Sequence, residues 1–573
     1  MFHNLIRLKR LFDLYKEYLT IKRMITILLS TFVLSIIELA GITLIFPFLK
    51  LVTDTSFHRS LVNKAAEFGL DAPLQEQRYT VMIVGITLVI IFIFKGIIQV
   101  LLIRYQARAA ADSNRFASNR IIEQALYSRF KLFQEQSAVK LASISQANTM
   151  HCSLLFMAVA TSANEIILMS FIFVGASLFA PTATMLALVV IMITGFCFLL
   201  PISRRVALIG GKTQEIDLAR YRFVFAMANA IRDIKIMGLE LIFLKRNKDI
   251  TDKHVDLAAE YTAISAVPRI SIEVIMVCII VFACFWLEFS GGDIVESAPI
   301  LVTIGLIAVR VGPAFSRLAV SYNSFRYSLP LVETLISTQV LLSKYPQTRI
   351  DDKLDLVGDY QVTNLTFGYN EQMLLRNLSI NFPMGKAVAI IGKSGSGKST
   401  LLDLLAGLQQ PLKGDFSMGG IPFQPFLSSN FCSQLGYVPQ SISILDGSIA
   451  FNISLEEMPD NEYLMQAIER AHLTTFVTTL QNGVNTLIGE GGQGISGGQK
   501  QRIGIARALY RQPKLLILDE VTSSLDQQTQ AKVMSELFQL RGQTTLLIVT
   551  HEMSSVDGAD HRYQLINGTL HPC

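Results

Sequence analysis

Long runs of apolar residues fill the first 330 positions of the chain, and shorter runs separated by polar turns follow them. Six of the long runs come close to or exceed the ~20 residues that a helix needs to cross the hydrocarbon core of a bilayer. We therefore predict six membrane-spanning helices, at about residues 24–52, 80–103, 154–178, 183–200, 263–289 and 299–320. In residues 1–23, apolar positions recur at helical spacing among Lys and Arg, which favours a helix on the cytoplasmic membrane surface.

The distribution of Lys and Arg predicts the orientation of these helices. The N-terminal segment carries six Lys and Arg residues, whereas the short segments 179–182 and 290–298 carry none. Because cytoplasmic segments of membrane proteins are enriched in Lys and Arg, we expect both termini to be cytoplasmic. The long segments 104–151 and 201–262 then lie on the cytoplasmic side as well.

Composition narrows the class of protein. Apolar residues make up 51% of the chain and charged residues 17%, with a mean hydropathy of +0.43, which is too apolar for a soluble enzyme. The net charge of +5 is too small to indicate a nucleic-acid partner. The six Cys residues lack the spacing of metal ligands, and the charged N-terminal segment does not resemble a signal peptide.

A phosphate-binding loop is predicted in the C-terminal part of the chain. Strand-like alternation begins at Tyr360, and an apolar run at 387–391 precedes a match to G-x4-G-K-S/T and a helical pattern. Glycines let backbone N–H groups close around phosphate oxygens, the lysine offsets their charge, and the next hydroxyl faces Mg²⁺. The expected ligands of the nucleotide phosphates are Gly392, Lys393, Ser394, Gly395, Ser396, Gly397, Lys398, Ser399 and Thr400.

A second anion-binding motif and a pair of acids lie between residues 489 and 520. A Gly-rich turn opens into a helical pattern, and the N-terminus of a helix attracts anions. The apolar strand 515–518 follows and ends in two carboxylates, which suit Mg²⁺ and a hydrolytic water. These residues are Ser496, Gly497, Gly498 and Gln499 in the turn, and Asp519 and Glu520 after the strand.

The motifs and their order resemble those of ABC-transporter ATPases. The Gly-rich turn is similar to the signature LSGGQ, with Ile495 in place of Leu. Tyr369 resembles the aromatic residue that stacks on adenine, and Gln440 resembles the glutamine that contacts Mg²⁺ and the attacking water. Asp526, in Ser-Ser-Leu-Asp, resembles the D-loop, and His551 resembles the switch histidine at the γ-phosphate.

The resemblance implies a role for each acid and an assembly. Asp519 would organise Mg²⁺, and Glu520 would be the general base of ATP hydrolysis. The signature motif would bind the γ-phosphate of ATP held by an opposite subunit. Because both Glu520 and His551 are present, two copies of this chain would form two competent sites, and we expect a homodimer.

The expected architecture is that of an ABC exporter half-transporter. An α-helical six-span transmembrane domain, residues 1–330, would be followed by a linker, 331–357, and an α/β P-loop ABC nucleotide-binding domain, 358–573. In such exporters the helices continue into the cytoplasm and reverse at short coupling helices. We expect these reversals at residues 142–148 and 231–239.

Ionisable residues inside the predicted spans are candidates for substrate contacts. Each costs about 2.5–3.5 kcal/mol on insertion scales. Mutual pairing and helix extension beyond the bilayer explain such residues equally well. Arg310 and Arg317 lie seven residues apart on one face of the last span and would suit an anionic head group such as a pyrophosphate. The remaining ones are Glu38, Lys95, Glu165 and Glu273.

Patterns in the membrane half resemble bacterial PglK-type flippases of lipid-linked oligosaccharides. They are Arg310-Val-Gly-Pro-x3-Arg317, Ala266-Val-Pro-Arg269 and Ile37-Glu38 with Phe46-Pro-Phe48. The resemblance implies ATP-driven flipping of a polyprenyl-pyrophosphate oligosaccharide across the bacterial inner membrane. Export of peptides, toxins or hydrophobic drugs is the alternative within transport. An ATP-gated channel is disfavoured by the intact Glu520 and His551, and the predicted spans exclude a soluble ABC ATPase.

Overall fold

In the computed structural model the chain forms two compact units. The first contains residues 1–126 and 133–344, and the second contains residues 127–132 and 345–573. The structure describes residues 21–53, 58–59, 77–132, 137–179, 189, 200–289, 294–347, 350, 357–369, 372–489, 494–521, 527–551 and 556–573.

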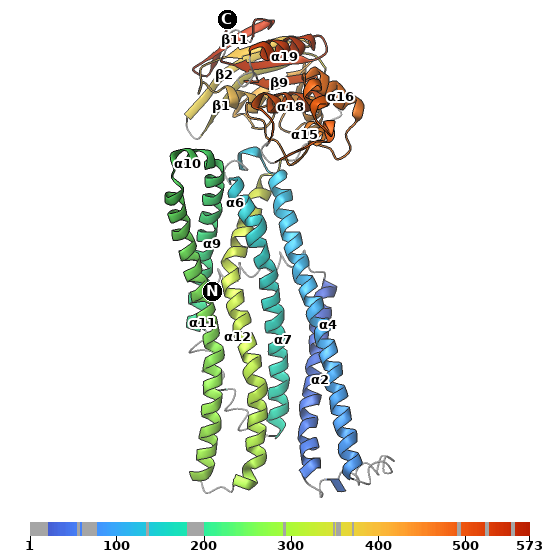
Figure 1. Cartoon of the computed structure of the whole chain (residues 1–573), viewed down its shortest axis with the longest axis vertical. Coiled ribbons are helices and arrows are strands. Elements are labelled where there is room, and N and C mark those ends of the chain that lie inside the picture. The colour runs from blue at the N-terminus through green and yellow to red at the C-terminus, as the bar shows by residue number, and fades with distance from the viewer. Residues whose placement is uncertain are drawn as a thin grey trace. The chain divides into compact units, whose positions relative to one another are not determined.

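Long helices make up the first unit (Figure 1). They contain five of the six predicted spans, and the predicted span 183–200 falls almost wholly outside the described residues. The last helix continues without interruption to Lys344, so its C-terminal part includes residues that the sequence assigned to a linker. The helices are α2 (Ile21–Thr53), α4 (Gln77–Leu126), α7 (Thr149–Phe179), α9 (Leu200–Asn229), α11 (Glu240–Phe289) and α12 (Ile294–Lys344).

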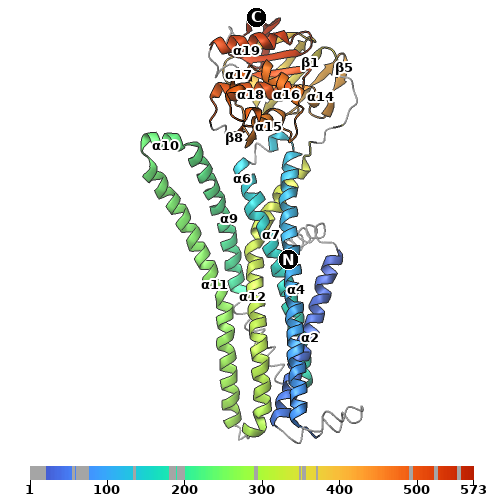
Figure 2. The ribbon, with the colours of Figure 1, turned by 45° about the vertical axis from the view of Figure 1, so that its right-hand side comes forward.

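Contacts among these helices define two groups joined by α7 and α12. Helices α2, α4 and α7 pack on one another, as do α9, α11 and α12. Between α7 and α12, the side chains of Leu168, Ile172, Ala314 and Phe315 form a buried apolar cluster. Figure 2 shows α9 and α11 diverging from α12 toward the end that carries the short helix α10 (Ile231–Met237).

Two helices among the described residues are long and apolar enough to cross a membrane, by length and composition. They are Gln77–Leu126 and the continuous helical stretch Ala138–Val174. None of the most apolar 18-residue window of Gln77–Leu126 is buried inside the protein. Exposed side chains in this helix include Ile86, Ile90, Phe94 and Ile97. Removal of apolar surface from water is favourable, so a helix with this exposed apolar face is more stable where an apolar medium or another protein surface covers it.

One of the two expected helix reversals is in place and the other is wrong. Helix α10 and its left-handed cap Gly238 form the reversal predicted at 231–239. By contrast, residues 142–148 continue as helix, through the end of α6 (Ala138–Ser143) and a π-helical turn (Ile144–Asn148) into α7. The helix starts earlier because Ser137 accepts a hydrogen bond from the N–H of Lys140 and so caps α6.

A close approach between α9 and α12 leads to a prediction about stability. A Cβ at Gly210 would collide with the backbone carbonyl oxygen of Tyr327, whereas a Cβ at Gly211 meets no described atom within 4 Å. We expect Gly210→Ala to destabilise the protein by about 1–3 kcal/mol, because two helix backbones must move apart. Gly211→Ala should stabilise it by up to about 1 kcal/mol through helix propensity. Thermal unfolding of the purified variants tests this contrast, and equal unfolding temperatures would contradict it.

The second unit contains two sheets with helices around them. A six-stranded sheet has the order β12-β11-β3-β10-β9-β6, in which all neighbouring strands are parallel except β11 and β12. Its strands are β3 (Ala387–Ile391), β6 (Leu435–Val438), β9 (Leu515–Asp519), β10 (Thr545–Thr550), β11 (His561–Ile566) and β12 (Thr569–Pro572). Strands β3, β9 and β10 are buried throughout, as expected for the apolar runs that form them.

An antiparallel sheet, in the order β2-β1-β4-β5, packs through a second buried core on the parallel sheet. The strands are β1 (Tyr360–Tyr369), β2 (Gln372–Phe382), β4 (Lys413–Met418) and β5 (Ile421–Phe423). The larger helices of the unit are α13 (Lys398–Leu405), α16 (Asn461–Arg470), α18 (Gly497–Tyr510) and α19 (Gln527–Gln539), with α14 (Ser429–Ser433), α15 (Ile449–Ser454) and α17 (Thr474–Thr479) as short turns of helix.

Residues 127–132, which follow α4, join the second unit by backbone pairing. The N–H of Arg129 donates to the carbonyl of Tyr345 at 3.2 Å, and the N–H of Gln347 donates to the carbonyl of Tyr127 at 2.7 Å. The N–H of Ile350 then donates to the carbonyl of Leu427 at 2.6 Å. The residues that follow α12 therefore form backbone hydrogen bonds with residues 127–129 and with Leu427, all within the second unit.

Candidate functional site

The order of the parallel strands brings four predicted segments to one edge of the sheet. In the order β3-β10-β9-β6, the strands are followed by the phosphate-binding loop, by His551, by Glu520 and by the loop with Gln440. Because the strands are parallel, their carboxyl ends lie at the same edge, which is where open α/β sheets bind ligands. Residues from four separate stretches of sequence thus meet at one site.

The carboxylate of Glu520 is the centre of this site. One oxygen accepts a hydrogen bond from Nε2 of Gln440 at 2.7 Å. The other oxygen lies 3.3 Å from Nδ1 of His551 and 3.7 Å from Nζ of Lys398. The Glu520 side chain is only 15% exposed, so these contacts fix its orientation. An orientated carboxylate beside a phosphate-binding loop can accept a proton from a water.

The backbone at Glu520 is in the left-handed region, with φ of 49°. Such a conformation in a residue other than glycine costs of order 1–3 kcal/mol and persists only where its surroundings enforce it. Here the N–H of Glu520 donates to the carbonyl of Val549 on β10 at 2.8 Å. The pairing between strands therefore continues up to the acid, and the chain bends sharply at the residue that carries it.

The phosphate-binding loop connects β3 to α13 as the sequence predicts. Gly397, the N-cap of α13, has φ of 97°, which favours glycine. Nζ of Lys398 donates to the carbonyls of Gly392 at 2.7 Å and Lys393 at 3.2 Å, so the ammonium group lies in the loop. The other predicted phosphate ligands differ in exposure: Ser394, Gly395 and Ser399 are exposed, and Ser396 and Thr400 are half-buried.

Asp519 ends β9 and is 7% exposed. Burial and the charge of Glu520 raise the pKa of its carboxyl to about 6. The described residues contain no group of three or more His, Cys, Asp or Glu side chains that could hold a metal. Mg²⁺ needs only one or two protein oxygens when phosphates and water supply the rest. Asp519, the hydroxyl of Ser399 and the amide of Gln440 provide oxygen ligands of this kind.

The raised pKa of Asp519 predicts a pH-dependent stability. Between about pH 4 and 6 the folded protein binds a proton here that the unfolded chain has lost, so the free energy of unfolding falls as pH rises. We expect Asp519→Asn to stabilise the nucleotide-free protein at pH 7.5 by an amount on the order of 2 kcal/mol, and much less at pH 4. Thermal unfolding at both pH values, with Asp415→Asn as an exposed control, tests this. A gain independent of pH would contradict it.

The predicted signature motif forms the start of α18. The hydroxyl of Ser496 accepts from the N–H of Gln499 at 3.2 Å, and the side chain of Gln499 accepts from the N–H of Ser496 at 2.8 Å. This capping box fixes the first turn of a 14-residue helix. Ser496 and Gly497 are exposed, so the N-terminus of α18 is accessible to an anion.

Tyr369, the residue predicted to stack on adenine, lies at the end of β1. The predicted D-loop residue, Asp526, falls outside the described residues. The Tyr369 side chain is 41% exposed, and its ring meets that of Phe367 edge to face with centroids 5.1 Å apart. An exposed aromatic face of this kind can stack on a nucleobase.

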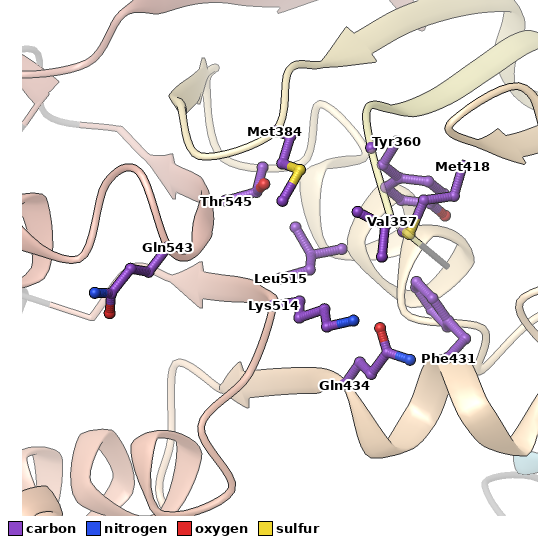
Figure 3. A pocket seen from close by; sticks show the side chains of 11 residues that line it. Val357, Tyr360, Met384, Met418, Phe431, Gln434, Lys514, Leu515, Gln543 and Thr545 are labelled. Carbon is purple, nitrogen blue, oxygen red and sulfur yellow. The ribbon is translucent and has the colours of Figure 1, made fainter. Parts of the chain in front are cut away.

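A separate cavity in the same unit is too small for a nucleotide. It has a volume of about 30 Å³ and is lined by Tyr360, Phe431, Gln434, Lys514 and Leu515, among others (Figure 3). Leu515 and Thr545 begin their strands, so the cavity lies at the amino ends of the parallel strands. Small-molecule sites typically have volumes of about 300–1,000 Å³. This cavity is therefore not a candidate for the predicted nucleotide site.

Of the two arginines predicted to contact substrate, the structure describes the side chain of Arg317. Nε and Nη2 of Arg317 on α12 donate to the two carboxylate oxygens of Glu165 on α7, at 2.6 and 3.0 Å. Glu165 is 5% exposed and Arg317 is 52% exposed. The side chain of Arg310 lies outside the described part of the helix. Arg317 therefore forms an ion pair with Glu165. The sequence analysis named Glu165 as an ionisable residue in a span but did not predict this pair.

Two polar residues of the second unit with well-defined contacts were not among the predicted site residues. Gln409 is buried and contacts Tyr369, and Arg507 donates from its guanidinium to the backbone carbonyls of Ser443 and Asn452. Burial lowers the pKa of Arg507. The sequence pattern placed Arg507 on the helix that follows the signature motif, which was a signal for its position. No local pattern distinguishes Gln409 from its neighbour Gln410.

Comparison with known proteins finds a similar family and a similar fold. Residues 375–523 match the family model described as ABC transporter. An ATP-dependent lipid A-core flippase of Photorhabdus laumondii is 36% identical over 41% of each chain. A protein of the same name from Salmonella typhimurium is 28% identical over 60% of each chain, so the chain matches less than two thirds of either relative. The structure of a bacterial Atm1-family ABC exporter with ATP bound is similar over 93% of this chain and 94% of that chain, with a TM-score of 0.75 and 20% identity.

Proposed function

Because residues 375–523 are an ABC transporter ATPase domain and the chain has the fold of an ABC exporter, we propose that it uses ATP to move a lipid-linked substrate across a bacterial inner membrane. The observation that carries the proposal is the orientated Glu520 carboxylate, in contact with Gln440 and His551 beside the phosphate-binding loop. An acid held in this way suits repeated hydrolysis rather than the binding of a nucleotide alone.

In the ATPase domain each residue would have a defined task. The loop N–H groups and Lys398 would hold the phosphates, and Tyr369 would stack on the base. Glu520 would accept the proton of the attacking water, which Gln440 and His551 would help to orient. Mg²⁺, held by Ser399 and Asp519 with Gln440, would neutralise charge on the phosphates. The partly buried site would strengthen these electrostatic interactions.

The proposed location in a membrane is supported by α4. Its most apolar 18-residue window is not buried in the protein, and a bilayer is the medium that would cover such a surface. The lysine and arginine distribution supports cytoplasmic termini and a cytoplasmic ATPase domain.

A homodimer is the proposed assembly. The exposed N-terminus of α18 is available to a second copy of the chain, whose bound ATP it would contact. Closure of two ATPase domains on two nucleotides would then drive the helical units between conformations. An isolated ATPase domain is accordingly expected to hydrolyse ATP slowly.

For the substrate, we propose a polyprenyl-pyrophosphate oligosaccharide. The relatives named lipid A-core flippases support a lipid-linked substrate in general. The half-exposed guanidinium of Arg317 supports an anionic head group, because an accessible guanidinium suits the recognition of phosphate groups.

Transport in proteoliposomes tests the proposal. Vesicles would contain the purified chain and a labelled polyprenyl-pyrophosphate oligosaccharide, with Mg-ATP and a glycosidase added outside. Chains whose ATPase domain faces outward should move the glycan to the inner leaflet and protect it from the enzyme. Glu520→Gln is the inactive control. Protection of lipid A alone would overturn the oligosaccharide but leave a lipid flippase, and uptake of a hydrophobic peptide alone would favour the alternative exporter.

A further inference from the structure

We propose that Gln409 is a positioning residue for the nucleobase, because its buried amide joins the hydroxyl of Tyr369 to Asp403 on the helix that follows the phosphate-binding loop. Gln409 is 6% exposed. Its Nε2 donates to Oη of Tyr369 at 3.0 Å and to Oδ2 of Asp403 at 3.1 Å. The inference rests on the proposed binding of ATP and concerns how the base is held.

The position of Gln409 is itself determined by the end of α13. The carbonyl of Asp403 accepts from the N–H groups of both Leu408 and Gln409, at 2.8 and 3.2 Å. Gly407, the residue before Leu408, has φ of 72° and approaches the carbonyl of Pro425 so closely that a side chain there would collide with it. The glutamine therefore has little freedom to move away from Asp403.

The orientation of the amide follows from its partners. A carboxylate accepts hydrogen bonds and does not donate them, so the NH₂ group of Gln409 must face Asp403. The second hydrogen of the same NH₂ group points to the Tyr369 hydroxyl. Burial raises the pKa of Asp403, and the bond from Gln409 opposes this shift. Loss of the amide would leave the partly buried carboxylate of Asp403 without one of its donors.

The consequence for binding concerns the ring of Tyr369. Tyr369 is 41% exposed, and its ring touches Phe367 edge to face. The hydrogen bond that its hydroxyl accepts from Gln409 limits rotation and displacement of the exposed ring face. Because α13 begins at the phosphate-binding loop, Gln409 fixes the ring relative to the residues that would hold the phosphates. Pre-ordering a contact in its bound geometry strengthens binding without adding a new contact.

The test separates affinity for the base from affinity for the phosphates. We expect Gln409→Leu to raise the KM for ATP about 2–10-fold, the equivalent of one hydrogen bond, with a smaller effect on kcat. Its affinity for inorganic tripolyphosphate, which has no base, should not change. Tyr369→Phe, which removes only the hydroxyl, should raise KM equally, and the double variant should add nothing to either single variant. Gln410→Leu, the same change at the exposed neighbouring glutamine, is the matched control.

Several outcomes would overturn the inference. An unchanged KM in Tyr369→Phe would do so even if Gln409→Leu failed to fold, because Tyr369→Phe leaves the contact between Gln409 and Asp403 intact. Equal losses of ATP and tripolyphosphate affinity in Gln409→Leu would show damage to α13 instead of a role in base binding. If Tyr369→Ala bound ATP as tightly as wild type, the base would lie elsewhere. Absence of ATP hydrolysis by the wild-type protein in lipid would instead reject the proposed function.

Discussion

Replacing Glu520 by Gln is expected to leave ATP bound while slowing its hydrolysis by about 10²–10⁴-fold. The amide cannot accept the proton of the attacking water, but it has nearly the shape of the carboxylate. Its oxygen can still accept from Nε2 of Gln440, so the arrangement around the site should survive. Lys398 loses a counter-charge at 3.7 Å and remains beside the carbonyls of the loop.

Two measurements on purified protein in lipid test this prediction. ATPase rates give the loss of turnover, and a fluorescent ATP analogue gives the affinity of the same variant for nucleotide. Glu469→Gln, the same change at an exposed position on α16, is the control and should hydrolyse ATP at the wild-type rate. A Glu520→Gln rate within a few-fold of wild type would remove this residue from the role of base. Loss of binding together with hydrolysis would indicate a structural role.

Removing Arg317 is expected to destabilise the helical unit more than removing the acid that it contacts. Arg317→Leu leaves the carboxylate of Glu165, 5% exposed, without two charge-assisted hydrogen bonds. Breaking a buried pair on one side costs about 3–5 kcal/mol, because an uncompensated charge remains buried. Glu165→Gln leaves a neutral amide and an arginine that is 52% exposed, so its cost should be about 1 kcal/mol or less.

The double variant Glu165→Gln, Arg317→Gln separates structural and substrate roles. Two neutral amides can form a hydrogen bond between α7 and α12, so thermal stability should recover most of what Arg317→Leu loses. If Arg317 also binds an anionic head group, this stable variant should lack the stimulation of ATPase activity by the lipid-linked oligosaccharide. Full stimulation would limit Arg317 to the contact between helices. A double variant as unstable as Arg317→Leu would contradict the argument from buried charge.

Local patterns explain why much of the ATPase domain was predictable. The strand before the phosphate-binding loop, the helix after it and the strand that ends at Asp519 all occur as expected. Each depends on a few consecutive residues, such as a buried apolar run or a glycine at a positive φ. The wrong prediction of a reversal at 142–148 also has a local explanation. Ser137 caps a helix that begins at Ala138, so the chain is already helical where the reversal was expected. The helical segments were readable from their apolar length, whereas their packing was not.

The sequence by itself determined the class of the protein: apolar helices of membrane-spanning length, followed by a domain with phosphate-binding and acidic motifs. Only the tertiary structure decided which side chains meet. Gln440 and Glu520 are 80 residues apart, and Glu165 and Arg317 are 152 apart. The hydrogen bonds of Gln409 likewise join Tyr369 on β1 to Asp403 on α13. The physical reason is that such contacts follow from strand order and helix packing, which bury particular faces together, and no pattern within a short stretch of chain records its distant partner.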